Sequence, residues 1–201
     1  MRNGRTGLAA VAALAVLGAG GMASCQAEED PISITEDTIS TDVLVTASVR
    51  TTQDGIWWDY VLENTSSEAV WIVEPRGALV FADRSVAEGV ALVAAMYPVR
   101  GDVDHAQAPA TAVVELAPGE TREGTGTAPR PLEPFSDREG DRPVRLPAEP
   151  ATARICAGYV TSSQVEGAGG VRDLEDGTFS LGNAVGFPLQ RLACSTTHPL
   201  T

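Results

Sequence analysis

Residues 56–73 read IWWDYVLENTSSEAVWIV, and this stretch decides the fold. In its first eight residues, large apolar side chains occupy every second position: Ile56, Trp58, Tyr60 and Leu62. A period of two is that of a β-strand with one buried face. The polar run NTSS predicts a turn after this strand, and AVWIV predicts a second strand. The stretch therefore predicts two consecutive strands joined by a tight turn.

Similar runs continue on both sides of this stretch. They are an alternating segment at 43–50, ALVF at 78–81, TAVVEL at 111–116, TREGTGT at 121–127, ARICAGYV at 153–160 and LQRLACS at 189–195. Short strands separated by turn residues at spacings near ten are typical of antiparallel sandwiches and barrels. A chain of 201 residues is long enough for one such core. We therefore expect an all-β fold, with residues 43–201 forming a single domain.

Two segments fit this pattern less well. Residues 86–97 begin with the form of a helix capping box, but the following VALVAAMY has no polar face, so both a short helix and a buried strand are open. Residues 129–150 contain six prolines among mixed charges. This composition predicts a long irregular loop, packed across an edge of the sheet.

The order YVLENTSSEAVWIV followed by ELAPGET resembles small Ig-like domains of bacterial surface and secreted proteins. In those domains a strand ends at an Asn-Thr/Ser turn, a second strand follows, and a Leu-x-Pro-Gly-Glu turn comes later. The resemblance covers about residues 43–127 and implies an Ig-like antiparallel β-sandwich. It implies no activity, because such folds carry many functions.

The N-terminus reads as a targeting segment. Arg2 and Arg5 precede an apolar run at 8–21 that would span about 21 Å as a helix, short of a bilayer core of about 30 Å. Such dimensions are those of a signal peptide. Met22-Ala23-Ser24-Cys25 follows and resembles the lipobox of bacterial lipoproteins. The resemblance implies cleavage after residue 24, a diacylglycerol on Cys25 and a protein anchored on the outer face of the cell membrane.

Residues 25–42 carry six carboxylates and no basic residue after Cys25, which predicts an extended acidic tether. With Cys25 assigned to the lipid, Cys156 and Cys194 remain as an even pair in an oxidising compartment. We expect them to form a disulfide that closes a loop of about forty residues, worth on the order of 3–4 kcal/mol.

Charge and composition limit the partners. The formal net charge is -13, which argues against nucleic acid as a partner and against docking on anionic lipid headgroups through the protein surface. All fourteen basic residues are arginine, so Schiff-base and P-loop lysine chemistry is excluded. The membrane is expected to be reached through the lipid, and the remaining partner is a protein or another component of the cell envelope.

Candidate catalytic and metal-binding residues are few. The two histidines are His105, within an Asp-Val-Asp-His run, and His198 near the C-terminus. Acidic turns at 137–141 and 173–177 do not match a calcium-binding loop, and no nucleophile motif is present. We expect no cofactor, no metal and no enzymatic activity. A hydrolase that uses converging carboxylates and a metal carrier around His105 are the alternatives.

Adjacent tryptophans give one clue to a binding surface. Trp57 and Trp58 must point to opposite faces of one strand. One is expected in the core and the other outside, where it is either covered by the proline-rich loop or part of a recognition surface. The sequence therefore predicts a lipid-anchored β-sandwich that acts as a binding or structural module of the envelope.

Overall fold

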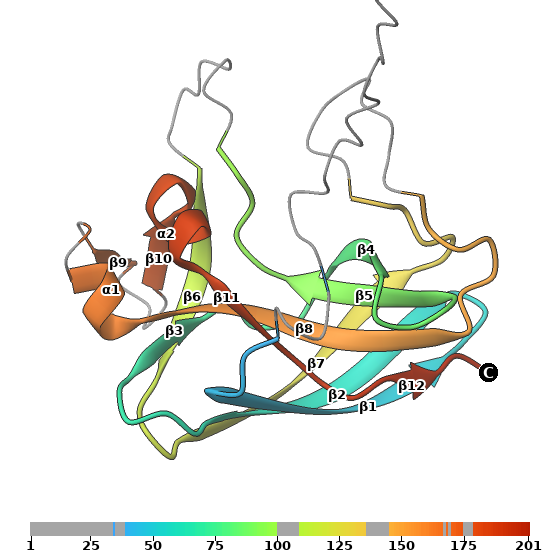
Figure 1. Cartoon of the computed structure of the whole chain (residues 1–201), viewed down its shortest axis with the longest axis horizontal. Helices are drawn as coiled ribbons and strands as arrows, with labels where there is room; N and C mark the ends of the chain where they lie inside the picture. The colour runs from blue at the N-terminus through green and yellow to red at the C-terminus, as the bar shows by residue number, and fades with distance from the viewer. Residues whose placement is uncertain are drawn as a thin grey trace, which may run out of the picture.

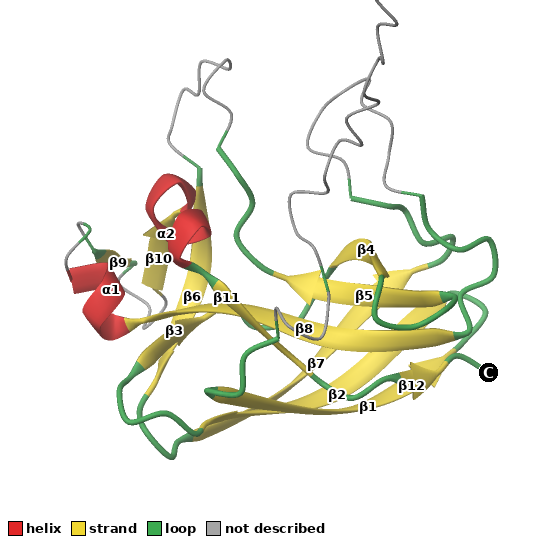
Figure 2. Ribbon diagram, viewed as in Figure 1, coloured by secondary structure: helices red, strands yellow, loops and turns green. Residues whose placement is uncertain are grey.

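The computed structural model describes residues 34, 39–99, 109–135, 145–166, 168, 170–174 and 179–201. The signal peptide and Cys25 therefore lie outside the described residues, as do His105 and the acidic turn at 137–141. Within the described part, the chain is mostly β-strand and has two short helices, in agreement with the all-β prediction (Figure 2).

The strands and helices follow one another along the chain in this order (Figure 1): β1 (Val43–Thr51), β2 (Gly55–Asn64), β3 (Val70–Ile72), β4 (Leu79–Asp83), β5 (Gly89–Ala94), β6 (Ala110–Leu116), β7 (Thr121–Pro129), β8 (Thr152–Thr161), α1 (Ser162–Glu166), β9 (Val171–Asp173), β10 (Phe179–Gly182), α2 (Asn183–Leu189), β11 (Arg191–Cys194) and β12 (His198–Pro199). Each of the strand-like runs in the sequence overlaps one of these strands.

The strands form two sheets. A three-stranded sheet has the order β1-β2-β7, and a larger sheet has the order β4-β5-β8-β3-β6-β10-β9, with β11 and β12 also paired to β8. All described pairs are antiparallel except β5 with β8, which run parallel from Gly89↔Thr152 to Ala94↔Ala157. The expectation of a wholly antiparallel arrangement is therefore wrong at this pair. Strands β6 and β7 lie between β5 and β8 in the chain, and this long connection allows β8 to enter the sheet in the same direction as β5.

The main hydrophobic core lies between the two sheets. In the three-stranded sheet, every second residue of each strand points into this core, and Ile56, Trp58 and Leu62 are fully buried. The large sheet contributes residues such as Leu92 and Ile155. Two smaller clusters cover the opposite face of the large sheet. The large sheet is therefore apolar on both faces, whereas the three-stranded sheet is apolar on one.

Within residues 86–97, the segment Gly89–Ala94 forms the strand β5. Every residue of β5 is buried, which explains why the run VALVAAMY has no polar face. The capping-box pattern at its start instead lies in the turn between β4 and β5, where Glu88 has a φ of 56°. The two helices lie elsewhere, at the end of the large sheet (Figure 1), and α1 and α2 place Val165 and Phe187 against the cluster beneath them.

The described beginning of the proline-rich segment packs on a sheet edge as expected. Pro134 lies beside Val80 of the edge strand β4, and the amide of Phe135 donates to the Val80 carbonyl at 2.9 Å. The Phe135 ring packs against Phe81 with centroids 5.3 Å apart. The loop thus covers one edge of the large sheet.

Part of the acidic segment that precedes β1 also contacts the folded body. Ile34 is buried in a cluster with Phe81 and Leu192, on the face of the large sheet away from the three-stranded sheet. Ile39 forms a bridge with Leu192, and the amide of Ser40 donates to the Leu192 carbonyl at 2.7 Å. These contacts fall inside the range expected to be tether, 25–42.

Candidate functional site

The outer face of the three-stranded sheet is a surface that no described element covers. Strand alternation places twelve side chains on it in four rows across β1, β2 and β7: Leu44–Glu63–Thr121, Thr46–Val61–Glu123, Ser48–Asp59–Thr125 and Arg50–Trp57–Thr127. We call this surface the Trp57 face. In Figure 1 the second sheet and both helices lie on the other side of this sheet.

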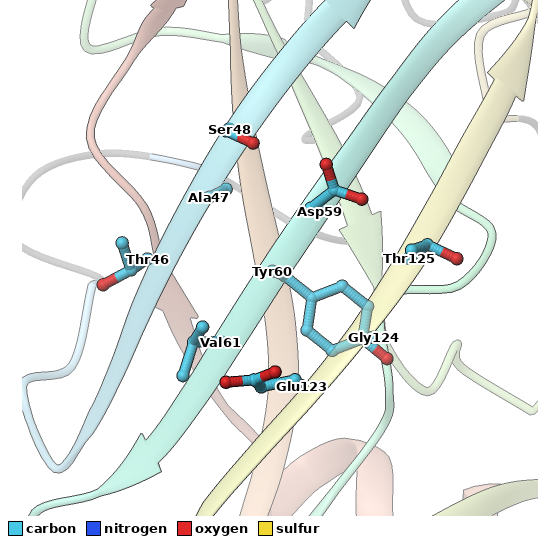
Figure 3. A pocket seen from close by; sticks show the side chains of 9 residues that line it. All are labelled: Thr46, Ala47, Ser48, Asp59, Tyr60, Val61, Glu123, Gly124 and Thr125. Atoms are coloured by element: carbon cyan, nitrogen blue, oxygen red, sulfur yellow. The ribbon is translucent and has the colours of Figure 1, made fainter.

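A shallow groove of about 590 Å³ runs over the middle of the Trp57 face. Its polar lining comes from all three strands and includes Ser48, Asp59, Glu123 and Thr125 (Figure 3). The groove is open to solvent, and apolar residues such as Val61 lie between these hydroxyl and carboxylate groups. This arrangement suits a ligand that offers many hydrogen bonds over an extended surface.

Trp57 stands in the row next to this groove and is 45% exposed, whereas Trp58 is fully buried. The prediction that the two indoles point to opposite faces is therefore confirmed. The described parts of the proline-rich segment, 129–135 and 145–150, therefore leave Trp57 exposed. An exposed tryptophan supplies a large, rigid apolar plate at a low cost in side-chain entropy.

Behind this face, the sheet is held by two aromatic side chains that reach across β7. The Trp58 indole N–H donates to the Pro75 carbonyl at 2.7 Å, and the Tyr60 hydroxyl donates to Glu74 Oε1 at 3.1 Å. The Tyr60 ring lies beside Gly124 in Figure 3. The backbone that carries the groove is thereby fixed from inside.

Glu74 is the centre of the ionic network at this edge. Arg122 Nε and Arg76 Nη2 lie 2.8 and 3.0 Å from its carboxylate oxygens, and its side chain is only 12% exposed. Burial opposes ionisation of Glu74, but the hydrogen bonds and charges of Arg122 and Arg76 outweigh it, so its pKa is lowered. Burial, followed by the charge of Glu74, raises the pKa of Tyr60 to about 12.

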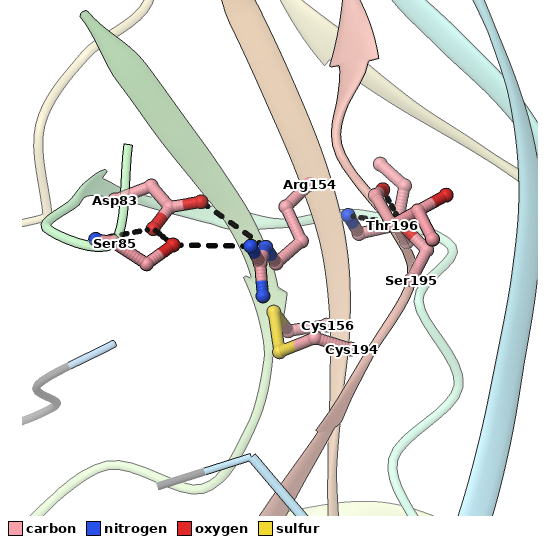
Figure 4. The surroundings of a disulfide bond; sticks show 8 residues. Asp83, Ser85, Arg154, Cys156, Cys194, Ser195 and Thr196 are labelled. Atoms are coloured by element: carbon pink, nitrogen blue, oxygen red, sulfur yellow. Dashed lines mark hydrogen bonds and ion pairs between the residues drawn. A yellow bond between two sulfur atoms is a disulfide. The ribbon is translucent and has the colours of Figure 1, made fainter. Parts of the chain in front are cut away.

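The predicted pairing of Cys156 with Cys194 is present in the structure, with an Sγ–Sγ distance of 2.07 Å (Figure 4). The two cysteines are register partners on the neighbouring strands β8 and β11. The bond therefore joins two strands of one sheet, and it does not cross between the sheets.

Close to the disulfide lies an ion pair that the sequence did not indicate. Arg154 Nε is 3.1 Å from Asp83 Oδ2, with side chains 7% and 0% exposed. Ser85 Oγ donates to Asp83 Oδ1 at 2.6 Å and accepts from Arg154 Nη2 at 3.0 Å (Figure 4). These interactions hold the β4–β5 turn against β8 and therefore have a structural role.

The remaining candidates from the sequence are not brought together. His198 lies on β12, where burial lowers its pKa. Asp173 ends β9, and the acidic turn after it continues into residues that the structure does not describe. Within the described ranges, no group of three or more His, Cys, Asp or Glu side chains is placed to hold a metal ion. Among the same residues, no helix has the length and apolarity needed to span a membrane.

The sequence indicated some residues of the Trp57 face and missed others. Alternation placed Trp57 and Asp59 opposite the core, and the same signal was present at Thr46 and Ser48. Glu123 and Thr125 were assigned only to an alternating run. The pairing order β1-β2-β7, which makes these residues neighbours, is not visible in any local pattern.

Comparison of the chain with protein-family models, curated proteins and solved structures finds no match. The class is therefore defined by the structure: an all-β domain of two sheets, with a disulfide inside the larger sheet and one uncovered face on the smaller.

Proposed function

We propose that this protein is a lipid-anchored, extracytoplasmic binding module that contacts its partner through the Trp57 face. The observation that carries the proposal is the uncovered face itself, with Trp57 45% exposed beside a groove lined by hydroxyls and carboxylates. A sheet that is apolar on one side and polar on the other needs no exposed tryptophan for folding. A tryptophan beside a groove offers a ligand a large, rigid apolar contact, and this supports a binding role for the face.

We further propose that the fold is a variant of the Ig-like β-sandwich. Two sheets that share a core of alternating residues support this assignment. Two features set the variant apart: the parallel pair β5–β8 and a disulfide within one sheet instead of between sheets.

The anchor rests on the N-terminal sequence, in which the apolar run 8–21 precedes Met22-Ala23-Ser24-Cys25. Two acyl chains bind a bilayer firmly, whereas one binds it only marginally. In the source organism, Cys25→Ala should move the protein from the membrane fraction to the soluble fraction, and Ser24→Ala should leave it in the membrane. Retention of the Cys25→Ala protein in membranes would contradict the anchor.

A non-enzymatic role is supported by the openness of the groove. Asp59 is 54% exposed at its side chain and lies 3.8 Å from Arg50, and Glu123 is also exposed. Active sites are usually enclosed clefts, whereas both of these acids stand in a groove that is open to solvent. In-cell photocrosslinking from position 125 should capture a partner, and the same probe at Tyr97 should not. Equal capture at both positions would count against this surface.

A further inference from the structure

The chemistry of the Trp57 face restricts its ligand. Along its four rows, Ser48, Thr46 and the threonines of β7 offer hydroxyls that both donate and accept hydrogen bonds. Asp59 and Arg50 add a strong acceptor and a strong donor next to the Trp57 indole. A sugar ring has an apolar C–H face and hydroxyls around its edge. The indole of Trp57 can stack on such a face, and the neighbouring polar side chains can donate hydrogen bonds to the hydroxyls and accept them.

The charge of the face excludes polyanions. Three carboxylates, those of Asp59, Glu63 and Glu123, stand on it with the single guanidinium of Arg50. The protein as a whole carries a formal charge of -13. Nucleic acids, phosphate-rich polymers and anionic headgroups would all be repelled by this surface. An uncharged polymer meets no such penalty.

The dimensions of the face suit an extended ligand. Side chains on one face recur every two residues, and neighbouring strands are about 4.8 Å apart, so the four rows cover about 20 by 10 Å. An extended chain a few rings long fits its dimensions.

The position of the face gives access to such a polymer. Ile34, the first described residue, packs on the side of the large sheet that faces away from the three-stranded sheet. A chain anchored at Cys25, as proposed above, reaches Ile34 within nine residues, at most about 30 Å. The anchor therefore joins the domain on the side opposite to the Trp57 face, which is then directed away from the bilayer.

We infer that the Trp57 face binds a neutral polysaccharide, with a sugar ring stacked on Trp57 and its hydroxyls bonded to Asp59, Arg50 and Thr125. This inference rests on the proposed function, since it names the ligand of the same surface. It assigns the indole to stacking and the neighbouring polar side chains to orientation of the ring.

The test is native affinity electrophoresis of the purified mature protein through gels that contain dextran, xylan, mannan, galactomannan or hydroxyethyl cellulose, with alginate as the anionic comparison. Retardation by at least one neutral polymer and none by alginate is expected. Trp57→Ala should weaken the retarding affinity about tenfold or more, and Trp57→Phe should retain most of it. Tyr97→Ala, which truncates an aromatic that is 38% exposed elsewhere, is the matched control.

A second variant covers the case in which Trp57→Ala does not fold. Thr125→Val keeps the shape of the side chain, removes its hydroxyl and should also reduce retardation. Migration unaffected by every neutral polymer, or equal retardation of wild type and Trp57→Ala, would overturn the inference. A dimer that Trp57→Ala dissociates would overturn it as well. If polysaccharides fail while crosslinking from position 125 captures a protein, the sugar ligand is wrong and the proposed binding module stands.

Discussion

At the scale of single residues, two glycines of β7 lie directly opposite two aromatic residues of β2: Gly126 pairs with Trp58, and Gly124 with Tyr60. A Cβ on Gly126 would overlap both the Pro75 carbonyl oxygen and the Trp58 ring, and one on Gly124 would overlap the Tyr60 phenol. The absence of side chains on β7 lets the rings lie across the strand and bond beyond it. The glycines of Gly124-Thr125-Gly126 thus leave space for the aromatic rings of Trp58-Asp59-Tyr60 on the neighbouring strand.

Gly126→Ala should therefore destabilise the domain by about 1–3 kcal/mol, because the indole must leave its hydrogen bond to Pro75. Gly77→Ala is the control, since a Cβ there meets nothing within 4 Å. We expect it to change the free energy of unfolding by less than about 0.5 kcal/mol. Urea unfolding of both variants measures the difference, and equal stabilities would show that β7 has room for a side chain.

The buried phenol of Tyr60 leads to a prediction at alkaline pH. Its folded-state pKa of about 12 lies above the ordinary value of 10.0, so the folded state favours the neutral phenol. The resulting stabilisation, up to about 2 kcal/mol, is complete below pH 10 and is lost as pH rises towards 12. Because the chain has no lysine, few other groups titrate in this range.

Stability measured by urea unfolding between pH 9 and 12 should fall, and Tyr60→Phe should make the fall shallower. Some dependence should remain in that variant, because burial also raises the pKa of Tyr159. Absorbance at 295 nm gives the same transition directly. A phenol at position 60 that titrates near 10 would contradict the buried hydrogen bond to Glu74.

At the scale of elements, the sequence predicted most strands because every second residue is buried along strands such as β1 and β2, which gives a visible apolar alternation. The assignment of β5 was ambiguous. A strand buried on both faces is a continuous apolar run, and hydrophobic periodicity cannot distinguish such a run from a buried helix. The short strands β9, β10 and β12 were missed, and so were the helices. α2 contains Gly186 and Pro188, which disfavour a helix locally, and tertiary packing overrides that preference.

One element depends on a buried charge pair. Arg154 of β8 holds the β4–β5 turn through Asp83, and nearly all of both side chains is buried. Arg154→Met should destabilise the domain by about 3–5 kcal/mol, because the Asp83 carboxylate is left buried without its counter-charge. The measurement is the free energy of unfolding in urea at pH 7.

A second substitution separates the charge from the packing. Asp83→Asn added to Arg154→Met keeps an acceptor for Ser85 and removes the orphaned charge. The double variant should recover much of the lost stability. If it is no more stable than Arg154→Met alone, then the loss comes from packing of the arginine side chain and the ion pair is not its cause.

At the scale of the whole molecule, strand order and layer order could not be predicted. Hydrophobic alternation states which side of a strand is buried, but it does not state which strand lies beside it. The parallel pair β5–β8 joins segments about sixty residues apart, and the uncovered Trp57 face exists only because β1, β2 and β7 form a separate sheet. Trp57 could be assigned to the outside from the sequence, whereas its surroundings required the topology.

The N-terminal segment raises a last question at this scale, namely where the tether ends and the domain begins. Composition places the boundary at residue 42, yet Ile34 is 1% exposed among Phe81, Val93 and Leu192, beside the disulfide. If this contact is part of the fold, Ile34→Ala should leave a cavity and destabilise the mature protein by about 2–4 kcal/mol. A residue on a free tether would change stability by less than about 0.5 kcal/mol.

Leu174→Ala is the matched control, because Leu174 is an aliphatic residue that is 49% exposed. Both variants are compared by urea unfolding of the intact mature chain. A neutral Ile34→Ala would free the acidic segment as far as Ile39, which pairs with Leu192, and lengthen the reach from Cys25 to about 50 Å, enough for the domain to turn either sheet towards the membrane. If Ile34→Ala is destabilised instead, Ile34 is part of the fold and only nine residues connect it to Cys25. The anchor then joins the domain on the side opposite to the Trp57 face, which is directed away from the membrane.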